Sequence, residues 1–102
     1  MIPAIRNQAD SLRSLCLDYD VQRLELFGSA ATSSQLHDIG DLDFLVEFQP
    51  KALETYADNY FGLLEDLQQL FGKPVDLVVG SAVKNPYFLQ SIDRTKTLVY
   101  EA

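Results

Sequence analysis

Three aspartates and one glycine-serine pair are the residues of this chain whose types and spacing could do chemistry. Asp41 and Asp43 are two positions apart in the segment DLDFLVEF, and Asp76 interrupts the apolar segment VDLVV. If both segments are strands and are neighbours in one sheet, the three carboxylates meet on one face. A group of carboxylates of this kind predicts a site for one or two Mg²⁺ ions.

The alternative is that these acids are only solvated. On a strand, the Cα atoms of Asp41 and Asp43 lie about 6.6 Å apart and the two side chains leave the same face. Bringing three acids together without a cation is unfavourable, because like charges and desolvation both penalise the ionised forms. Asp41 alone would fit an exposed strand end, but the pair together with Asp76 favours a metal site.

Gly28 and Ser29 lie where an apolar strand gives way to small residues, in the segment LFGSAA. Gly28 can adopt backbone angles closed to other residues, and Ser29 can cap a helix that begins at Ala30. Free N–H groups at such a turn attract anions. Taken alone the pair is usually just a tight turn. Followed by the aspartate pair, it predicts a site where Mg²⁺ and a triphosphate bridge the turn and the carboxylates.

The elements that must position these residues follow from hydrophobic periodicity and from Gly and Pro punctuation. In chain order we predict helix 3–18, strand 21–27, a short helix from 30, strand 41–48, helix 53–71, strand 75–79, helix 86–92 and strand 97–100. Alternating helices and strands indicate an α/β (α+β) fold, with a small sheet packed with helices. The link between the first two strands is short for a parallel crossover, so we expect a mixed sheet in one domain, 1–102.

Composition narrows the class of protein. With 102 residues, 47% of them hydrophobic, and a net charge of −7, the chain is a globular domain without a broad basic surface for nucleic acid. Cys16 has no partner for an internal disulfide, and we expect it on the apolar side of the first helix. No signal pattern or membrane-length apolar run is present. We therefore expect a cytoplasmic protein with no direct nucleic-acid or membrane partner.

Other features are interpreted as structural. His37 is predicted to be a surface loop residue. The DIGDLD segment resembles a calcium loop only weakly, because Gln49 stands where the closing acid should be. Tyr56, Tyr60 and Leu63 recur at helical spacing and are expected in the core, although exposed members of this stripe could dock a partner.

The segments LFGSAA, GDLDFLVEF and VDLVV, with TLVYEA at the end, resemble the minimal nucleotidyltransferase family of the polymerase-β-like superfamily. The resemblance implies the nucleotidyltransferase fold. It implies that Gly28 and Ser29 hold nucleotide phosphates, that Asp41 and Asp43 bind Mg²⁺, and that Asp76 is the third carboxylate and a possible general base.

The resemblance also implies a function. Such domains act as antitoxins that transfer AMP from ATP to a tyrosine of a partner HEPN-type toxin. The chain departs from the usual family pattern, since Thr32 and Ser33 stand where Arg and Gly are expected and Gly40 replaces a common Ser. Losing the Arg removes a bidentate phosphate donor. Two alternatives therefore stay open, an antitoxin that neutralises its toxin by binding alone and a nucleotide or metal sensor without transfer.

Overall fold

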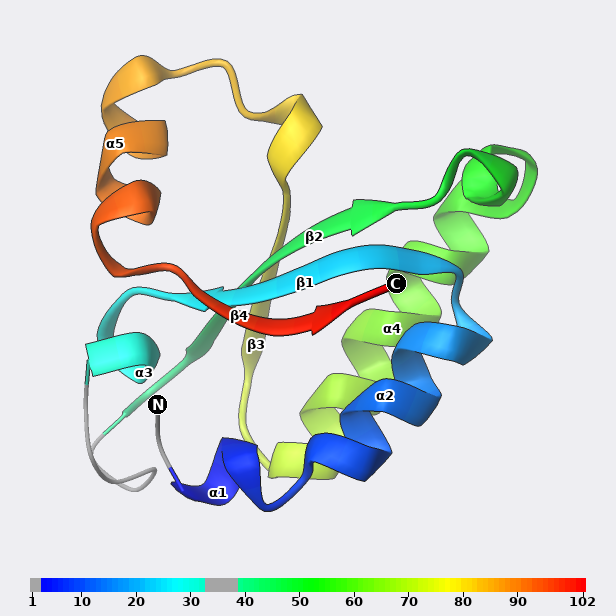
Figure 1. The fold of residues 1–102 in the computed structure, drawn as a ribbon, viewed down its shortest axis with the longest axis horizontal. Helices are drawn as coiled ribbons and strands as arrows, with labels where there is room; N and C mark the ends of the chain where they lie inside the picture. Colours follow the sequence, from blue (N-terminus) through cyan, green and yellow to red (C-terminus); the bar gives the residue numbers. More distant parts are fainter. Residues whose placement is uncertain (1–2, 33–38) are drawn as a thin grey trace.

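A four-stranded mixed sheet in the order β3-β2-β1-β4 forms the centre of the computed structural model, which describes residues 3–32 and 39–102 (Figure 1). The elements in chain order are α1 (Pro3–Arg6), α2 (Ala9–Asp18), β1 (Val21–Phe27), α3 (Ser29–Thr32), β2 (Leu42–Phe48), the 3₁₀ helix η2 (Pro50–Thr55), α4 (Tyr56–Phe71), β3 (Val75–Val79), the 3₁₀ turn η3 (Gly80–Ala82), α5 (Pro86–Thr95) and β4 (Thr97–Glu101). The predicted α/β class is confirmed.

Strand direction follows the length of the connections. β1 runs antiparallel to both β2 and β4, whereas β2 and β3 are parallel and are joined through η2 and α4. A parallel pair needs a long crossover, which α4 supplies, while the shorter link after β1 returns the chain antiparallel. The expected mixed sheet is therefore confirmed.

Helices cover the two faces of the sheet unequally. α2 and α4 pack on one face (Figure 1) through a core whose buried members include Leu12, Cys16, Leu24, Leu26, Phe44, Val46, Leu63 and Leu67. On the other face, α5 places Ile92 against Phe27 and Leu45. Because side chains alternate along β2, Asp43 shares this second face with Leu45. α5 thus covers part of the face that carries the candidate chemistry.

The predicted boundaries need several corrections. The helix expected over 3–18 is two helices, α1 and α2, separated by a turn at Asn7 and Gln8. Asn favours such turns because its side chain competes with helical backbone hydrogen bonds. α3 begins at Ser29 rather than Ala30, so Ser29 is the first helical residue and not a flanking cap. α5 continues past the expected end at Ile92.

Two predicted helix boundaries are confirmed. α4 ends at Phe71 and is followed by Gly72, which adopts a left-handed φ of 65° and donates its N–H to the carbonyl of Gln68. α5 begins after Asn85, whose Oδ1 accepts hydrogen bonds from the N–H groups of Tyr87 and Phe88. In both cases a single residue type satisfies the backbone groups that a helix end leaves unpaired.

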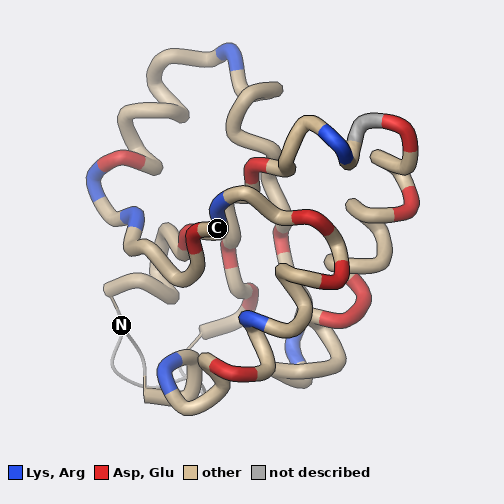
Figure 2. Tube along the Cα trace, turned by 45° about the vertical axis from the view of Figure 1, so that its right-hand side comes forward, with Lys and Arg blue, Asp and Glu red and all other residues tan. Residues whose placement is uncertain are grey.

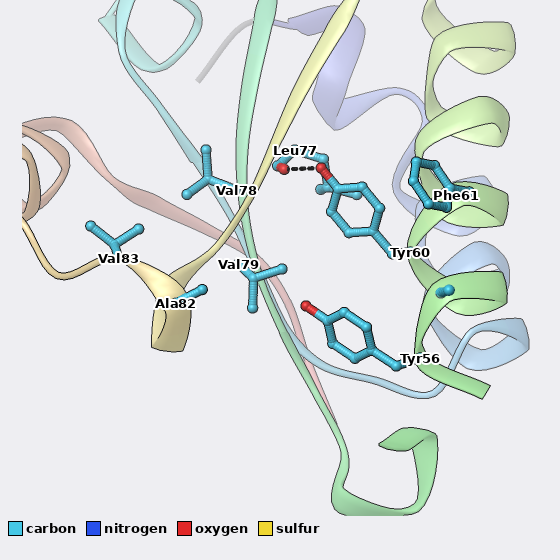
Figure 3. Close-up of a pocket in the computed structure, with 9 residues that line it drawn as sticks. Tyr56, Tyr60, Phe61, Leu77, Val78, Val79, Ala82 and Val83 are labelled. Carbon is cyan, nitrogen blue, oxygen red and sulfur yellow. Dashed lines mark hydrogen bonds between the residues drawn. The ribbon is translucent and has the colours of Figure 1, made fainter. Parts of the chain in front are cut away.

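Side chains of α4 cover part of the free edge of β3. The N–H of Val75 donates to Gln68 Oε1 at 3.2 Å, and the hydroxyl of Tyr60 donates to the carbonyl of Leu77 (Figure 3). These outward backbone groups would otherwise be available to pair with another strand. Helix α4 therefore both builds the core and blocks edge-to-edge pairing at this strand.

An apolar groove of about 400 Å³ continues along the same edge, between β3, α4 and η3 (Figure 3). Of the predicted core stripe, Leu63 is fully buried, Tyr60 is half-buried and lines the groove, and Tyr56 is 37% exposed. The expectation that the whole stripe is core is therefore wrong for Tyr56. Helical spacing predicts a shared face, but the open groove leaves one end of that face in water.

No helix within the two described ranges is long and apolar enough to cross a membrane.

Candidate active site

Asp43 and Asp76 are paired residues on the neighbouring parallel strands β2 and β3. Paired residues of adjacent strands project to the same face, so the two carboxylates lie side by side. Asp43 is half-buried and Asp76 is exposed. The juxtaposition that the sequence predicted for neighbouring strands is therefore formed by these two acids.

The carboxyl group of Asp43 is partly buried and lies near other acidic side chains. Partial burial raises the pKa of its carboxyl above the ordinary value, and the charges of Asp76 and Asp41 raise it further. Acidic residues are spread over most of the molecule, and the fewer Lys and Arg residues are also distributed over it, with some at both ends of α5 (Figure 2). Among the residues that the structure describes, the charges that act most strongly on Asp43 are therefore acidic.

Asp41 does not share the strand position that the sequence predicted. β2 begins at Leu42, so Asp41 lies just before it and is exposed. Within residues 3–32 and 39–102, no set of three or more His, Cys, Asp and Glu side chains is arranged to hold a metal ion. The acids that the register brings together are Asp43 and Asp76, with Asp41 close enough to act on Asp43 through its charge.

The donor set nevertheless fits Mg²⁺. This cation prefers carboxylate oxygens, and it is usually held by one or two protein carboxylates together with substrate phosphates. The raised pKa of Asp43 shows that negative charge at this point is unfavourable without a cation. Asp43 and Asp76 therefore suit a metal ion whose remaining ligands come from water and a nucleotide.

Gly28 brings the turn after β1 directly against this pair. Phe27, the last residue of β1, is paired with Asp43 across the antiparallel ladder, so the chain turns beside the carboxylate. Gly28 has a φ of 71°, and a Cβ atom added to it would lie 2.5 Å from Asp43 Oδ2. Both its backbone angle and its close approach require the absence of a side chain.

The turn is also tied to the far end of the chain. The N–H of Gly28 donates to Oγ1 of Thr95, at the end of α5, over 2.9 Å. Thr95 could not be predicted as part of the site, because 67 residues separate it from Gly28 and no local sequence pattern indicates the contact. A phosphate at this turn would therefore rely on groups other than the Gly28 amide, among them Ser29.

The short helix α3 contributes less than the sequence suggested. It spans four residues, too few for a strong helix dipole. Thr32, at the position where the sequence resemblance implies Arg, is exposed, and its hydroxyl donates to the carbonyl of Ser29 at 3.3 Å. Thr32 thus offers no cation to a phosphate. His37 and Ser33 lie outside the described residues.

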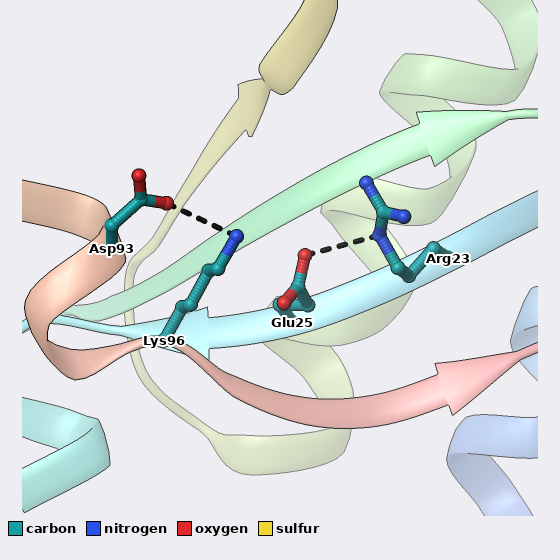
Figure 4. Close-up of polar contacts among 4 residues, drawn as sticks. All are labelled: Arg23, Glu25, Asp93 and Lys96. Atoms are coloured by element: carbon teal, nitrogen blue, oxygen red, sulfur yellow. Dashed lines mark hydrogen bonds and ion pairs between the residues drawn. The ribbon is translucent and has the colours of Figure 1, made fainter. Parts of the chain in front are cut away.

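Two pairs of oppositely charged side chains lie near the candidate site, one on β1 and one at the end of α5. Arg23 Nε contacts Glu25 Oε1 at 3.1 Å, and at the end of α5 Lys96 Nζ contacts Asp93 Oδ1 at 3.0 Å (Figure 4). Glu25 is buried, so its nearby Arg23 offsets part of the cost of burying a carboxylate. Within each pair, the basic and the acidic side chain compensate each other's charge. Within the described part of the chain, by contrast, the principal charges acting on Asp43 are acidic.

Cys16 takes no part in this site. It is fully buried in the core, and burial raises the pKa of its thiol to about 12. A buried thiol of this kind is inert at neutral pH.

The family model described as "Nucleotidyltransferase domain" matches residues 5–99. This chain belongs to the nucleotidyltransferase domain family. Among curated relatives, two proteins of Methanocaldococcus jannaschii, both provisionally named protein adenylyltransferases, are 34% and 42% identical to it. Each alignment covers 80% of this nucleotidyltransferase and 78% of the relative. The predicted enzyme class is confirmed.

Solved structures show the same fold. A protein described provisionally as a minimal nucleotidyltransferase superposes on this chain with a TM-score of 0.72 and 26% identity, covering 95% of both chains. A toxin–antitoxin structure with AMP-PNP gives a TM-score of 0.65 at 19% identity, covering 92% of this chain and 73% of that one. A complex of a tri-AMPylated Shewanella oneidensis HEPN toxin with its MNT antitoxin gives 0.62 at 17%, covering 96% and 73%. The resemblance to minimal nucleotidyltransferases is therefore confirmed.

Proposed function

We propose that this nucleotidyltransferase is an antitoxin that transfers AMP from ATP, in the presence of Mg²⁺, to a tyrosine hydroxyl of a partner HEPN-type toxin. The observation that carries the proposal is the pairing of Asp43 with Asp76 beside the Gly28 turn. The names of the curated relatives and the complexes among the structural relatives support the same reaction class.

The proposed step is a substitution at the α-phosphorus of ATP. The tyrosyl oxygen forms a bond to that phosphorus, the bond from the α-phosphorus to the bridging oxygen breaks, and pyrophosphate leaves. Asp76 is exposed, so an incoming hydroxyl can reach it, and we assign it the role of accepting the tyrosyl proton. Bound Mg²⁺ would supply neutralisation of the phosphate charge.

Asp41, Asp43 and Asp76 are assigned to hold the metal. Asp43 and Asp76 are adjacent in the sheet, and the exposed position of Asp41 at the start of β2 leaves it free to turn toward a bound nucleotide. Gly28 and Ser29 are assigned to the phosphates, with Gly28 providing close approach rather than a free amide.

The size of the domain supports a protein as the acceptor. The sheet and its helices use about three quarters of the 102 residues, and the connections between them that the structure describes are too short to enclose a second small substrate. The apolar groove along β3 is lined by none of the three aspartates. An acceptor that brings its own surface to the exposed acids fits this arrangement.

Two isotope labels test the reaction class directly. With ATP labelled on the α-phosphate, the partner protein should become labelled only in the presence of Mg²⁺, and peptide mapping should place the label on a tyrosine. With ATP labelled on the γ-phosphate, the partner should stay unlabelled. Label from the γ-phosphate alone would identify a kinase and exclude the proposal.

A masking antitoxin is the second candidate, and Thr32 favours it because this residue supplies no cation where the family has Arg. Masking predicts that an Asp41→Asn/Asp43→Asn protein still protects cells from the toxin. Enzymatic neutralisation predicts that the same double variant folds and binds the toxin but no longer protects.

A further inference from the structure

Thr95 makes the contact that joins α5 to the turn of the candidate site. Its Oγ1 accepts the N–H of Gly28 at 2.9 Å, and the bond is half-buried. Gly28 in turn lies against Asp43, because a Cβ atom added to Gly28 would be only 2.5 Å from Asp43 Oδ2. The three residues therefore form a continuous set of contacts from α5 to the carboxylate.

The helix that carries Thr95 is fixed to the sheet close by. Ile92, one turn earlier, is 1% exposed and packs against Phe27 and Leu45. Phe88 adds an edge-to-face contact with Phe27, with ring centroids 6.2 Å apart. The Lys96 N–H donates to the Ile92 carbonyl, so the helical geometry continues through Thr95. The hydroxyl is thus held by a rigid element rather than by a loop.

We propose that Thr95 is a positioning residue for the nucleotidyltransferase reaction: its hydroxyl holds the Gly28–Ser29 turn against Asp43. This inference rests on the proposed function, since it assumes that the turn holds the phosphates. Without the hydroxyl, the Gly28 N–H loses its acceptor in a half-buried place and the turn is free to shift. Small displacements of a phosphate from its attacking group lower rate strongly.

The test compares Thr95→Val, which keeps the shape and removes the hydroxyl, with Thr95→Ser, which keeps the hydroxyl. Thr97→Val is the matched control, because the Thr97 hydroxyl donates to the Thr95 carbonyl at 3.3 Å, whereas the Gly28 N–H donates to the Thr95 hydroxyl. We expect Thr95→Val to lower kcat for AMP transfer about tenfold, whereas Thr95→Ser and Thr97→Val stay within about twofold of wild type. A Thr95→Ser variant as slow as Thr95→Val would overturn the inference.

A second readout does not depend on transfer. In ¹⁵N-labelled protein without ligands, Thr95→Val should speed hydrogen exchange of the Gly28 amide at least tenfold, and Thr95→Ser should not. Binding of Mg²⁺ with a non-hydrolysable ATP analogue, followed by calorimetry, should weaken in Thr95→Val only. Faster exchange at Gly28 with unchanged kcat and unchanged analogue affinity would also overturn the inference.

A failure of the proposed function and a failure of the positioning role of Thr95 give different results. If wild-type protein transfers nothing to its partner, the proposed function fails, while weaker analogue binding by Thr95→Val still supports the positioning role. If wild type transfers AMP and Thr95→Val matches it in kcat and in analogue affinity, the positioning role fails and the function stands.

Discussion

A Cβ atom on Gly28 would lie 2.5 Å from Oδ2 of Asp43, so the turn after β1 and the central carboxylate of β2 occupy adjoining space. This relationship explains why the glycine of the glycine-serine pair and the aspartate of the next strand belong to one site. Phe27 and Asp43 are paired in the ladder, and the residue after Phe27 therefore meets the carboxylate.

Gly28→Ala should lower kcat for AMP transfer by at least about a hundredfold. The added methyl group would collide with Asp43, and a φ of 71° costs an alanine about 1–2 kcal/mol. Steady-state transfer assays and thermal melts measure both effects.

Two other glycines provide controls for Gly28→Ala. Gly72 also has positive φ, at 65°, but a Cβ there meets nothing within 4 Å, and Gly40 has neither constraint. Gly72→Ala should lower stability while leaving kcat near wild type, and Gly40→Ala should change little. Equal losses of kcat in Gly28→Ala and Gly72→Ala would show that backbone strain alone, and not contact with Asp43, decides the effect.

Asp43→Asn should raise the melting temperature at pH 7 by a few degrees in the absence of divalent cations. The pKa of Asp43 is raised in the folded protein, so the folded state holds this proton more tightly than the unfolded chain does. The ionised carboxylate therefore lowers stability above its folded pKa, and the penalty disappears as the pH falls. The gain in melting temperature should accordingly shrink between pH 7 and pH 4.

The exposed Glu54→Gln serves as the control for Asp43→Asn, and its melting temperature should stay near that of wild type. Added Mg²⁺ should raise the melting temperature of wild type and leave that of Asp43→Asn unchanged, because only wild type has the Asp43 carboxylate to bind the cation. A lower melting temperature for Asp43→Asn at pH 7 would contradict the raised pKa of Asp43.

Tyr19→Phe should lower the free energy of unfolding by about 1 kcal/mol at pH 7, because it removes a hydrogen bond. The Tyr19 hydroxyl donates to Asp66 Oδ2 at 2.6 Å, which links the end of α2 to α4. That bond, followed by burial and acidic neighbours, raises the pKa of Tyr19 to about 12. Since the folded pKa lies above the unfolded value, this contribution is complete below pH 10 and is lost as the pH rises toward 12.

Urea unfolding of wild type and Tyr19→Phe at pH 7 and pH 11 measures this difference, which should be smaller at pH 11. Gly62→Ala offers an independent check, because its Cβ would lie 2.5 Å from the Tyr19 ring. It should also destabilise the protein. A difference between wild type and Tyr19→Phe that grows with pH would contradict the assigned hydrogen bond.

Tyr60→Phe should lower the free energy of unfolding by about 1 kcal/mol, since the carbonyl of Leu77 loses its donor at the edge of β3. Tyr87→Phe is the matched control, because Tyr87 is 80% exposed and should respond by less than about 0.5 kcal/mol. Chemical denaturation of the three proteins provides the comparison. Equal stability of Tyr60→Phe and wild type would show that the bond adds nothing.

The parts of the fold with strong periodicity were predictable from sequence. β1 and β3 have the predicted bounds, and Gly72 and Asn85 mark helix ends because each satisfies a local backbone requirement. The break between α1 and α2 was missed because the apolar spacing continues across it. The start of β2 was predicted one residue early, at Asp41, because alternation alone does not show where hydrogen bonding begins.

The candidate site was predictable only as far as its local patterns reach. The pairing of Asp43 with Asp76 requires β2 and β3 to be neighbours. The sequence could not decide whether they are, and the sheet register shows that they are. Thr95 could not be found, because its contact with Gly28 is set by how α5 packs on the sheet. Long-range hydrogen bonds of this kind have no signature in the residues on either side.

The most direct test of the central claim is the intact mass of the partner HEPN-type protein after incubation with this nucleotidyltransferase, ATP and Mg²⁺. We predict a gain of one or more AMP units that is absent with Asp43→Asn, although that variant folds and binds the partner. An unchanged partner mass despite a stable complex, or an equal gain with Asp43→Asn, would contradict the assignment of Asp43 to AMP transfer.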